Sequence, residues 1–160
     1  MKFKKLAIIL ICLLIGAIVG SFGTIYWVGI KMAKVICFFK EAELGKSTLS
    51  TWEGYNSGNT SIAIWALQQH LKNLEEWSEI LENPEIDWPY KNNVEIELII
   101  THGRLAKLYK DTGQTEEKDV YLSKALTISQ SSANPAFNCL TNGTLLFDKV
   151  AVFDKYLYPR

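Results

Sequence analysis

The residues of this chain that could carry chemistry are two histidines, His70 and His102, each on or near an apolar helical stripe. A histidine paired with a serine or cysteine nucleophile would make a small hydrolase, but no GxSxG motif accompanies either residue. The alternative is a histidine packed in the core. A zinc site would need further ligands at suitable spacing. The sequence therefore predicts no catalytic residue, no cofactor and no metal, and favours a protein that is not an enzyme.

The GKST segment at 45–48 has the ending of a Walker A loop. That loop requires a glycine five residues before Gly45, where Lys40 stands, and a strand before it. The sequence offers neither feature, so we do not expect a nucleotide-phosphate site here.

The cysteines differ in their surroundings. Cys12 falls in an apolar segment, Cys37 lies just beyond it, and Cys139 is near the end of the chain. In an oxidising compartment Cys37 and Cys139 could form a disulfide that closes a loop of about 100 residues. The alternative is two free thiols, and the sequence leaves both open because pairing depends on distances.

The segments of the chain that carry these residues differ in net charge. The chain has 160 residues, and its 17 Lys and Arg balance 17 Asp and Glu. All the acids lie at or after Glu41, whereas residues 1–40 hold six lysines, so a basic segment precedes an acidic remainder. The acidic remainder disfavours nucleic-acid binding. The acidic stretch 75–87 either attracts basic partners or forms a solvated face.

An uncharged segment of 25 residues, 6–30, follows the basic tail 1–5. About 20 apolar residues in a helix cross a bilayer core of ~30 Å, so we expect a transmembrane helix that is retained as a signal anchor. A cleaved signal peptide is the alternative, but its apolar region is shorter and would close on an A-x-A pattern. Tyr26 and Trp27 fit the interfacial belt of such a helix.

The orientation of the helix depends on its flanking lysines, three on each side. The N-terminal amine adds a positive charge to the tail, so the positive-inside rule favours a cytoplasmic N-terminus and an exterior C-terminal domain. We expect a single-pass protein of the cell (inner or plasma) membrane. Within the helix, Gly16, Gly20 and Thr24 recur at intervals of four and predict a GxxxG-type face for homodimer contact. The alternative is that glycine is simply common in membrane helices.

Helix-capping and helix-ending residues, together with apolar residues at the 3.6-residue helical period, predict that the chain after residue 30 is helical. A helical extension, 31–44, ends at Gly45, and the domain 45–160 begins with a short helix that ends at Gly58. Thr60 and Thr115 are expected N-caps of later helices. Gly58, in the left-handed conformation, and Gly113 are expected to end the helices before them. Further helices are expected through 92–112, from Asn134 and Pro135, and over 144–157. The fold class is all-α: one transmembrane helix, then a small bundle or stack of αα-hairpins.

Four tryptophans lie within residues 52–88. Tryptophan is enriched at binding hot spots, although core packing is the commoner role. Trp65 lies off the apolar stripe of its helix, so Trp65 and Trp88 are the candidate partner-binding residues.

The hairpin of residues 105–126 resembles the tetratricopeptide-repeat family, on residues that match its large, small, aromatic and turn positions: Leu105, Ala106, Tyr109, Gly113, Leu122 and Ala125. The GNT and GQT turns, 55 residues apart, indicate two such hairpins, and the degenerate resemblance covers about 45 residues. It implies stacked hairpins whose concave face binds peptides or partner proteins. The sequence favours a membrane-anchored scaffold or adaptor that binds another protein. The alternatives are an accessory subunit assembled through the membrane helix and a small membrane-anchored hydrolase.

Overall fold

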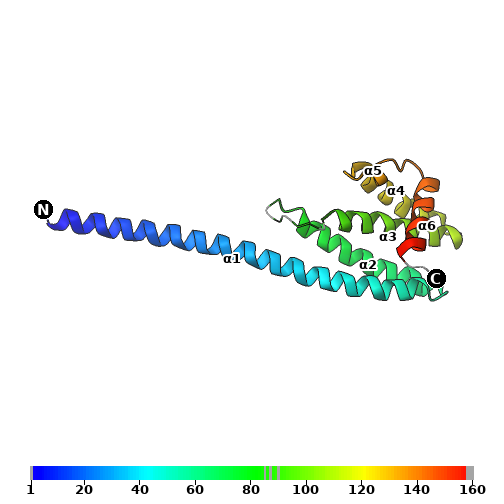
Figure 1. The fold of residues 1–160 in the computed structure, drawn as a ribbon, viewed down its shortest axis with the longest axis horizontal. Coiled ribbons are helices and arrows are strands. Elements are labelled where there is room, and N and C mark those ends of the chain that lie inside the picture. Colours follow the sequence, from blue (N-terminus) through cyan, green and yellow to red (C-terminus); the bar gives the residue numbers. More distant parts are fainter. Residues whose placement is uncertain (1, 85, 87, 90, 158–160) are drawn as a thin grey trace. The chain divides into compact units, whose positions relative to one another are not determined.

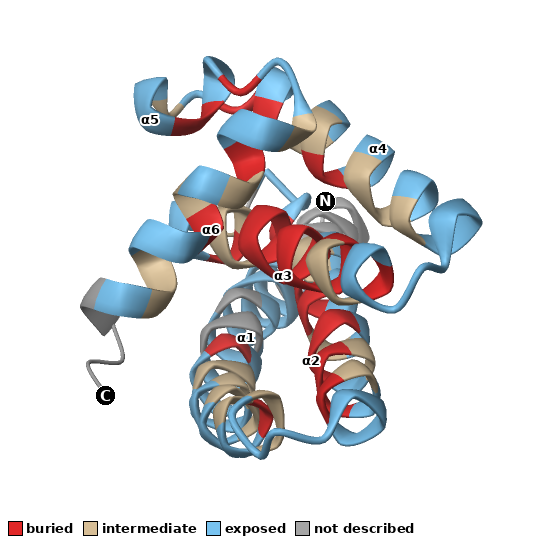
Figure 2. Cartoon of the chain, turned by 90° about the vertical axis from the view of Figure 1, so that its right-hand side faces the viewer, coloured by how far each residue is buried: buried red, intermediate tan, exposed pale blue. Residues whose placement is uncertain are grey.

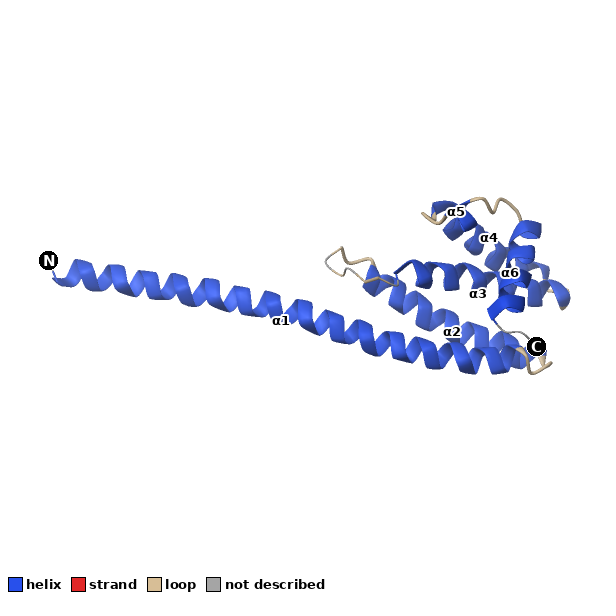
Figure 3. Cartoon of the chain, viewed as in Figure 1, coloured by secondary structure: helices blue, strands red, loops and turns tan. Residues whose placement is uncertain are grey.

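The computed structural model describes the backbone of residues 2–84, 86, 88–89 and 91–157, and the side chains of these residues except 2–15, 17–19, 30, 33–34 and 156–157. All the regular elements of this part are helices, so the all-α prediction is confirmed (Figures 1 and 3). They are α1 (Lys2–Tyr55), α2 (Thr60–Leu81), α3 (Lys91–Asp111), α4 (Thr115–Ser131), α5 (Pro135–Asn138) and α6 (Gly143–Leu157). The chain divides into two compact units, Met1–Phe39 and Lys40–Arg160.

The first unit consists of α1 up to Phe39. Its described large apolar side chains between Phe22 and Phe39, apart from Cys37, are 43–71% exposed. The Lys31 ammonium lies 3.9 Å from the centroid of the Trp27 ring. Most side chains of the predicted transmembrane segment 6–30 lie outside the described residues. Within the described part, no helix has an apolar stretch long enough to cross a membrane, so the membrane-spanning part of the fold prediction has no support from the structure.

In the second unit, α1 continues through Gly45 to Tyr55, so the predicted break at Gly45 and the separate short helix after it are wrong. A single glycine inside a helix costs only about 1 kcal/mol, which packing can outweigh. Here α1 packs on α2: Thr51 Oγ1 donates to the carbonyl of Ala66 at 3.3 Å. A Cβ built on Gly54 would lie 2.7 Å from the Ala66 Cβ, so glycine permits the close crossing.

The turns between the helices follow the prediction in one respect and differ in another. Gly58 has a φ of +74°, which confirms the expected left-handed glycine after α1, and Gly113 after α3 has the same conformation, with a φ of +75°. The N-caps lie one residue before the predicted threonines. Asn59 caps α2 with its side-chain oxygen, which accepts from the amides of Ser61 and Ile62, and Gln114 precedes α4 without a side-chain cap bond.

Helix α3 is the centre of the second unit, and it packs against α2, α4 and α6 (Figure 2). The α2 stripe predicted from the sequence is buried against it, including Leu67, Leu74 and Trp77. On another side, α6 approaches α3 at Gly103, where an added Cβ would lie 2.8 Å from Val150 Cγ2.

A buried ion pair joins three of these helices. Arg104 on α3 donates from Nε and Nη2 to one carboxylate oxygen of Asp154 on α6, at 2.9 and 2.7 Å. The Tyr55 hydroxyl, at the end of α1, donates to the other oxygen at 3.2 Å. Burial, with the negative charge of Asp154, raises the pKa of Tyr55 to about 12. The cluster therefore fixes the ends of α1 and α6 on α3.

Candidate functional site

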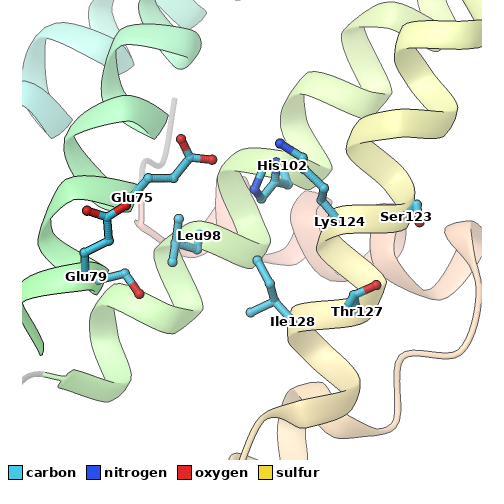
Figure 4. Close-up of a pocket in the computed structure, with 9 residues that line it drawn as sticks. Glu75, Glu79, Leu98, His102, Ser123, Lys124, Thr127 and Ile128 are labelled. Carbon is cyan, nitrogen blue, oxygen red and sulfur yellow. The ribbon is translucent and has the colours of Figure 1, made fainter. Parts of the chain in front are cut away.

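A groove of about 440 Å³ opens between α2 and α4, with α3 as its floor (Figure 4). Both flanking helices pack on α3, which holds them apart. The groove is lined by Glu75, Ser78, Glu79, Leu98, His102, Ser123, Lys124, Thr127 and Ile128.

The two walls of the groove differ in chemistry. Glu75 and Glu79, one helical turn apart on α2, are exposed, and neither has an ion-pair partner within the described part of the chain. The α4 wall presents Ser123, Lys124 and Thr127, which can donate hydrogen bonds. The α2 wall therefore carries the negative charge of the groove, and the α4 wall carries its positive charge.

The floor carries a buried imidazole among apolar side chains. His102 is only 2% exposed, and its Nδ1 has no hydrogen-bond partner among the described residues. Burial, and then the nearby charge of Lys124, lower its pKa from 6.5 to about 4. His102 is therefore uncharged at neutral pH, beside Leu98 and Ile128.

Aromatic side chains set the spacing of the three helices beyond His102. Tyr121 of α4 lies 5.8 Å from the His102 ring and stacks on Tyr109 of α3, with centroids 5.5 Å apart. The Gln68 amide of α2 donates to the Tyr109 hydroxyl at 3.1 Å and to the Tyr121 hydroxyl at 3.4 Å. These contacts join α2 to both α3 and α4 at this end of the groove.

Trp65 lies one turn before Gln68 and is 63% exposed. Residues 65, 68, 72, 75 and 79 follow alternating steps of three and four, so they share one stripe of α2. Trp65 thus continues the stripe that forms the acidic wall. Trp88, the other candidate, is half-buried in the connection between α2 and α3 and does not line the groove.

The remaining wall residues were not singled out in the sequence: Glu75, Glu79, Ser123, Lys124 and Thr127. The acidic stretch and the 3/4 spacing from Trp65 indicate the α2 wall. Nothing in the sequence indicates which face of α4 lies opposite, because that depends on how both helices pack on α3.

His70 belongs to a separate polar cluster. Its Nδ1 lies 3.1 Å from Ser47 Oγ, and its Nε2 lies 3.9 Å from Glu97 Oε2. The Asn73 amide donates to Ser47 Oγ at 3.1 Å. Serine, histidine and glutamate are the residue types of a hydrolase triad, but 3.9 Å is too long for a hydrogen bond.

The cavity that adjoins His70 has a volume of only about 10 Å³, room for about one water molecule. The contacts of this cluster join α1, α2 and α3. The GKST segment that contains Ser47 lies inside α1 and forms no loop. Among the described residues, no group of three or more His, Cys, Asp or Glu could hold a metal ion.

The other sequence candidates do not line the groove. Gly16, Gly20 and Thr24 are exposed on α1, and Thr24 Oγ1 donates to the Gly20 carbonyl at 2.7 Å. Cys37 and Cys139 are free thiols, the first buried and the second exposed. Burial raises the pKa of Cys37.

Comparison with known proteins adds no relative. No protein-family model, no curated protein and no solved structure matches this chain. The resemblance to tetratricopeptide repeats stays a prediction from the sequence.

Proposed function

We propose that this chain is a non-catalytic, single-pass membrane protein whose exterior helical domain binds a segment of another protein in the groove between α2 and α4. The observation that carries the binding role is the groove itself: two carboxylates, without an ion-pair partner among the described residues, face hydrogen-bond donors across an apolar floor with an uncharged histidine. Clefts with an apolar floor and a few convergent polar groups are the usual form of binding sites.

The proposed membrane anchor is supported by the sequence of residues 6–30, which holds no charge over 25 positions. Trp27 and Tyr26 are exposed, and Lys31 lies over the Trp27 ring, as suits the boundary between lipid and water. The basic tail supports a cytoplasmic N-terminus and an exterior acidic domain.

A matched pair of threonine variants tests the binding role. Thr127 is exposed and lines the groove, and Thr141 is exposed and does not. Thr127→Arg fills the groove with a long cation, whereas Thr141→Arg makes the same change of charge elsewhere. We expect tagged full-length protein in detergent to lose a co-purifying partner through Thr127→Arg and to keep it with Thr141→Arg. Equal yields from both variants would remove the groove as the binding site.

A second candidate function is an accessory subunit that assembles through α1. The observation that favours it is the face at Gly16 and Gly20, where an added Cβ meets no atom of the described residues within 4 Å. Crosslinking of a Gly20→Ile variant in membranes tests this candidate, because the larger side chain blocks close helix approach. An unchanged yield of crosslinked dimer or complex counts against it.

A further inference from the structure

The carboxylates of Glu75 and Glu79 indicate the charge of the ligand that the groove binds. One α2 carboxylate is paired with a cation of the chain: the Lys40 ammonium lies 3.4 Å from a carboxylate oxygen of Glu76. Glu75 and Glu79, on the stripe that faces α4, have no such partner in the described part of the chain. Residues four apart on a helix point the same way, so both carboxylates can approach one cation.

The floor offers an independent indication of a ligand. His102 is almost fully buried, and its Nδ1 lacks a hydrogen-bond partner among the described residues, which is costly unless something else satisfies it. Figure 4 shows its ring on the α3 side of the groove, between Glu75 and Lys124. Because this imidazole is uncharged at neutral pH, it does not repel a cation.

The apolar part of the groove suits the stem of a long basic side chain. Leu98 of α3 and Ile128 of α4 line the groove, and lysine and arginine bury their methylene stems on such surfaces while the charged head stays near water. On the opposite wall, Lys124 repels a second cation, and the Ser123 and Thr127 hydroxyls can donate to backbone carbonyls. A bound polypeptide would therefore place a basic side chain against the α2 wall and its backbone carbonyls against the α4 wall.

We infer that the groove takes a lysine or arginine side chain of the partner polypeptide, with its cationic head against Glu75 and Glu79 and its stem on Leu98 and Ile128. The inference rests on the proposed function. A polypeptide fits better than a free small amine because the α2 stripe extends from Glu79 to the exposed Trp65, about 21 Å along the helix.

The test uses n-butylammonium, which has the head and stem of lysine, with n-butanol and butyrate as matched probes. Full-length protein in detergent micelles carries ¹³C-labelled histidine and isoleucine, and the His102 and Ile128 signals are followed at neutral pH. We expect saturable shifts with n-butylammonium at millimolar concentration and none with the other two probes. Glu75→Gln/Glu79→Gln should weaken binding about tenfold, as the loss of charge-assisted hydrogen bonds does.

The control variant Glu53→Gln/Asp148→Asn removes two exposed acids outside the groove and should leave the binding unchanged. The inference is overturned if n-butylammonium causes no saturable shift, if n-butanol causes the same shift, or if both double variants bind n-butylammonium equally.

Failure of this inference differs from failure of the proposed function. If Thr127→Arg abolishes partner capture while Glu75→Gln/Glu79→Gln preserves it, the groove is the site but a basic anchor is wrong. If neither variant affects capture, the groove is not the site. If a free choline or amino-acid amide saturates the groove far more tightly than a lysine-containing peptide, the polypeptide occupant is wrong.

Discussion

His102 combines burial with an unsatisfied nitrogen, and both follow from its place on α3 under the groove. Its neighbours are the Lys124 ammonium, which disfavours a second positive charge, and the Tyr121 ring. The neutral form is therefore the one that the folded protein holds. His70 is as deeply buried; its Nδ1 has Ser47 as a hydrogen-bond partner, and its Nε2, like Nδ1 of His102, has none among the described residues.

The stability of the protein should depend on pH through His102. Its pKa is about 4 when folded and 6.5 when exposed, so the unfolded chain binds the extra proton first. The contribution is fully present above pH 6.5 and is lost as the pH falls towards 4, up to about 3 kcal/mol. Denaturant unfolding of wild type and His102→Gln across this range measures it. The wild type should lose more stability than the variant, and parallel profiles would contradict the assignment.

The ion pair of Arg104 and Asp154 makes a second prediction for single residues. Asp154→Asn leaves the buried guanidinium without its counter-charge, which we expect to cost about 3 kcal/mol of unfolding free energy. Tyr55→Phe removes one hydrogen bond to the same carboxylate and should cost about 1 kcal/mol. Asp148→Asn, at an exposed position of α6, serves as the control in urea unfolding. Equal midpoints for Asp154→Asn and Asp148→Asn would show that the pair does not fix α6.

At the scale of the helix, the sequence predicts what depends on spacing along the chain. Leu67, Leu71 and Leu74 follow the helical period and are buried as expected. Gly113 ends α3 because glycine adopts the left-handed conformation without strain. The predicted helix end at Gly45 is wrong because the cost of glycine inside a helix is small. The contacts between α1 and α2, which cannot be read from the sequence, keep α1 helical there.

Two glycine variants separate packing from propensity. Gly103→Ala places a Cβ 2.8 Å from Val150 Cγ2 and 3.3 Å from Leu146 Cγ, so α6 must shift, and we expect a loss of about 2 kcal/mol. Gly45→Ala meets nothing within 4 Å inside α1 and should raise stability by about 0.5 to 1 kcal/mol. Chemical denaturation of both variants measures the difference. A gain from Gly103→Ala would mean that α3 and α6 are not closely packed.

At the scale of the whole molecule, the charge division at Glu41 and the all-helical character could be predicted, because both are properties of composition and period. Trp65 could be placed off the buried stripe of α2 for the same reason. That Glu75 and Glu79 line the same groove as Lys124 and Thr127 could not be predicted, since this requires two helices far apart in sequence to pack on the third. The groove is thus a property of the folded unit.

The proposed anchor predicts how the full chain partitions in cell fractions. An uncharged 25-residue helix should keep the protein in the membrane pellet after alkaline carbonate extraction, with residues 1–30 intact by N-terminal sequencing. A Glu53→Gln variant, unchanged in residues 1–30, should partition in the same way. Mature protein in the carbonate supernatant that lacks its first twenty or so residues would contradict retention of the anchor.

Site-specific photo-crosslinking in native membranes tests the central claim most directly. A photoreactive amino acid replaces Ser123 on the groove wall or, as the control, Ala151, which is exposed on α6 and does not line the groove. We expect position 123 to form one discrete adduct with another protein, and Thr127→Arg in the same chain to abolish it, while position 151 forms none. Equal adducts from both positions, or an adduct at 123 that persists with Thr127→Arg, would contradict a partner segment bound between α2 and α4.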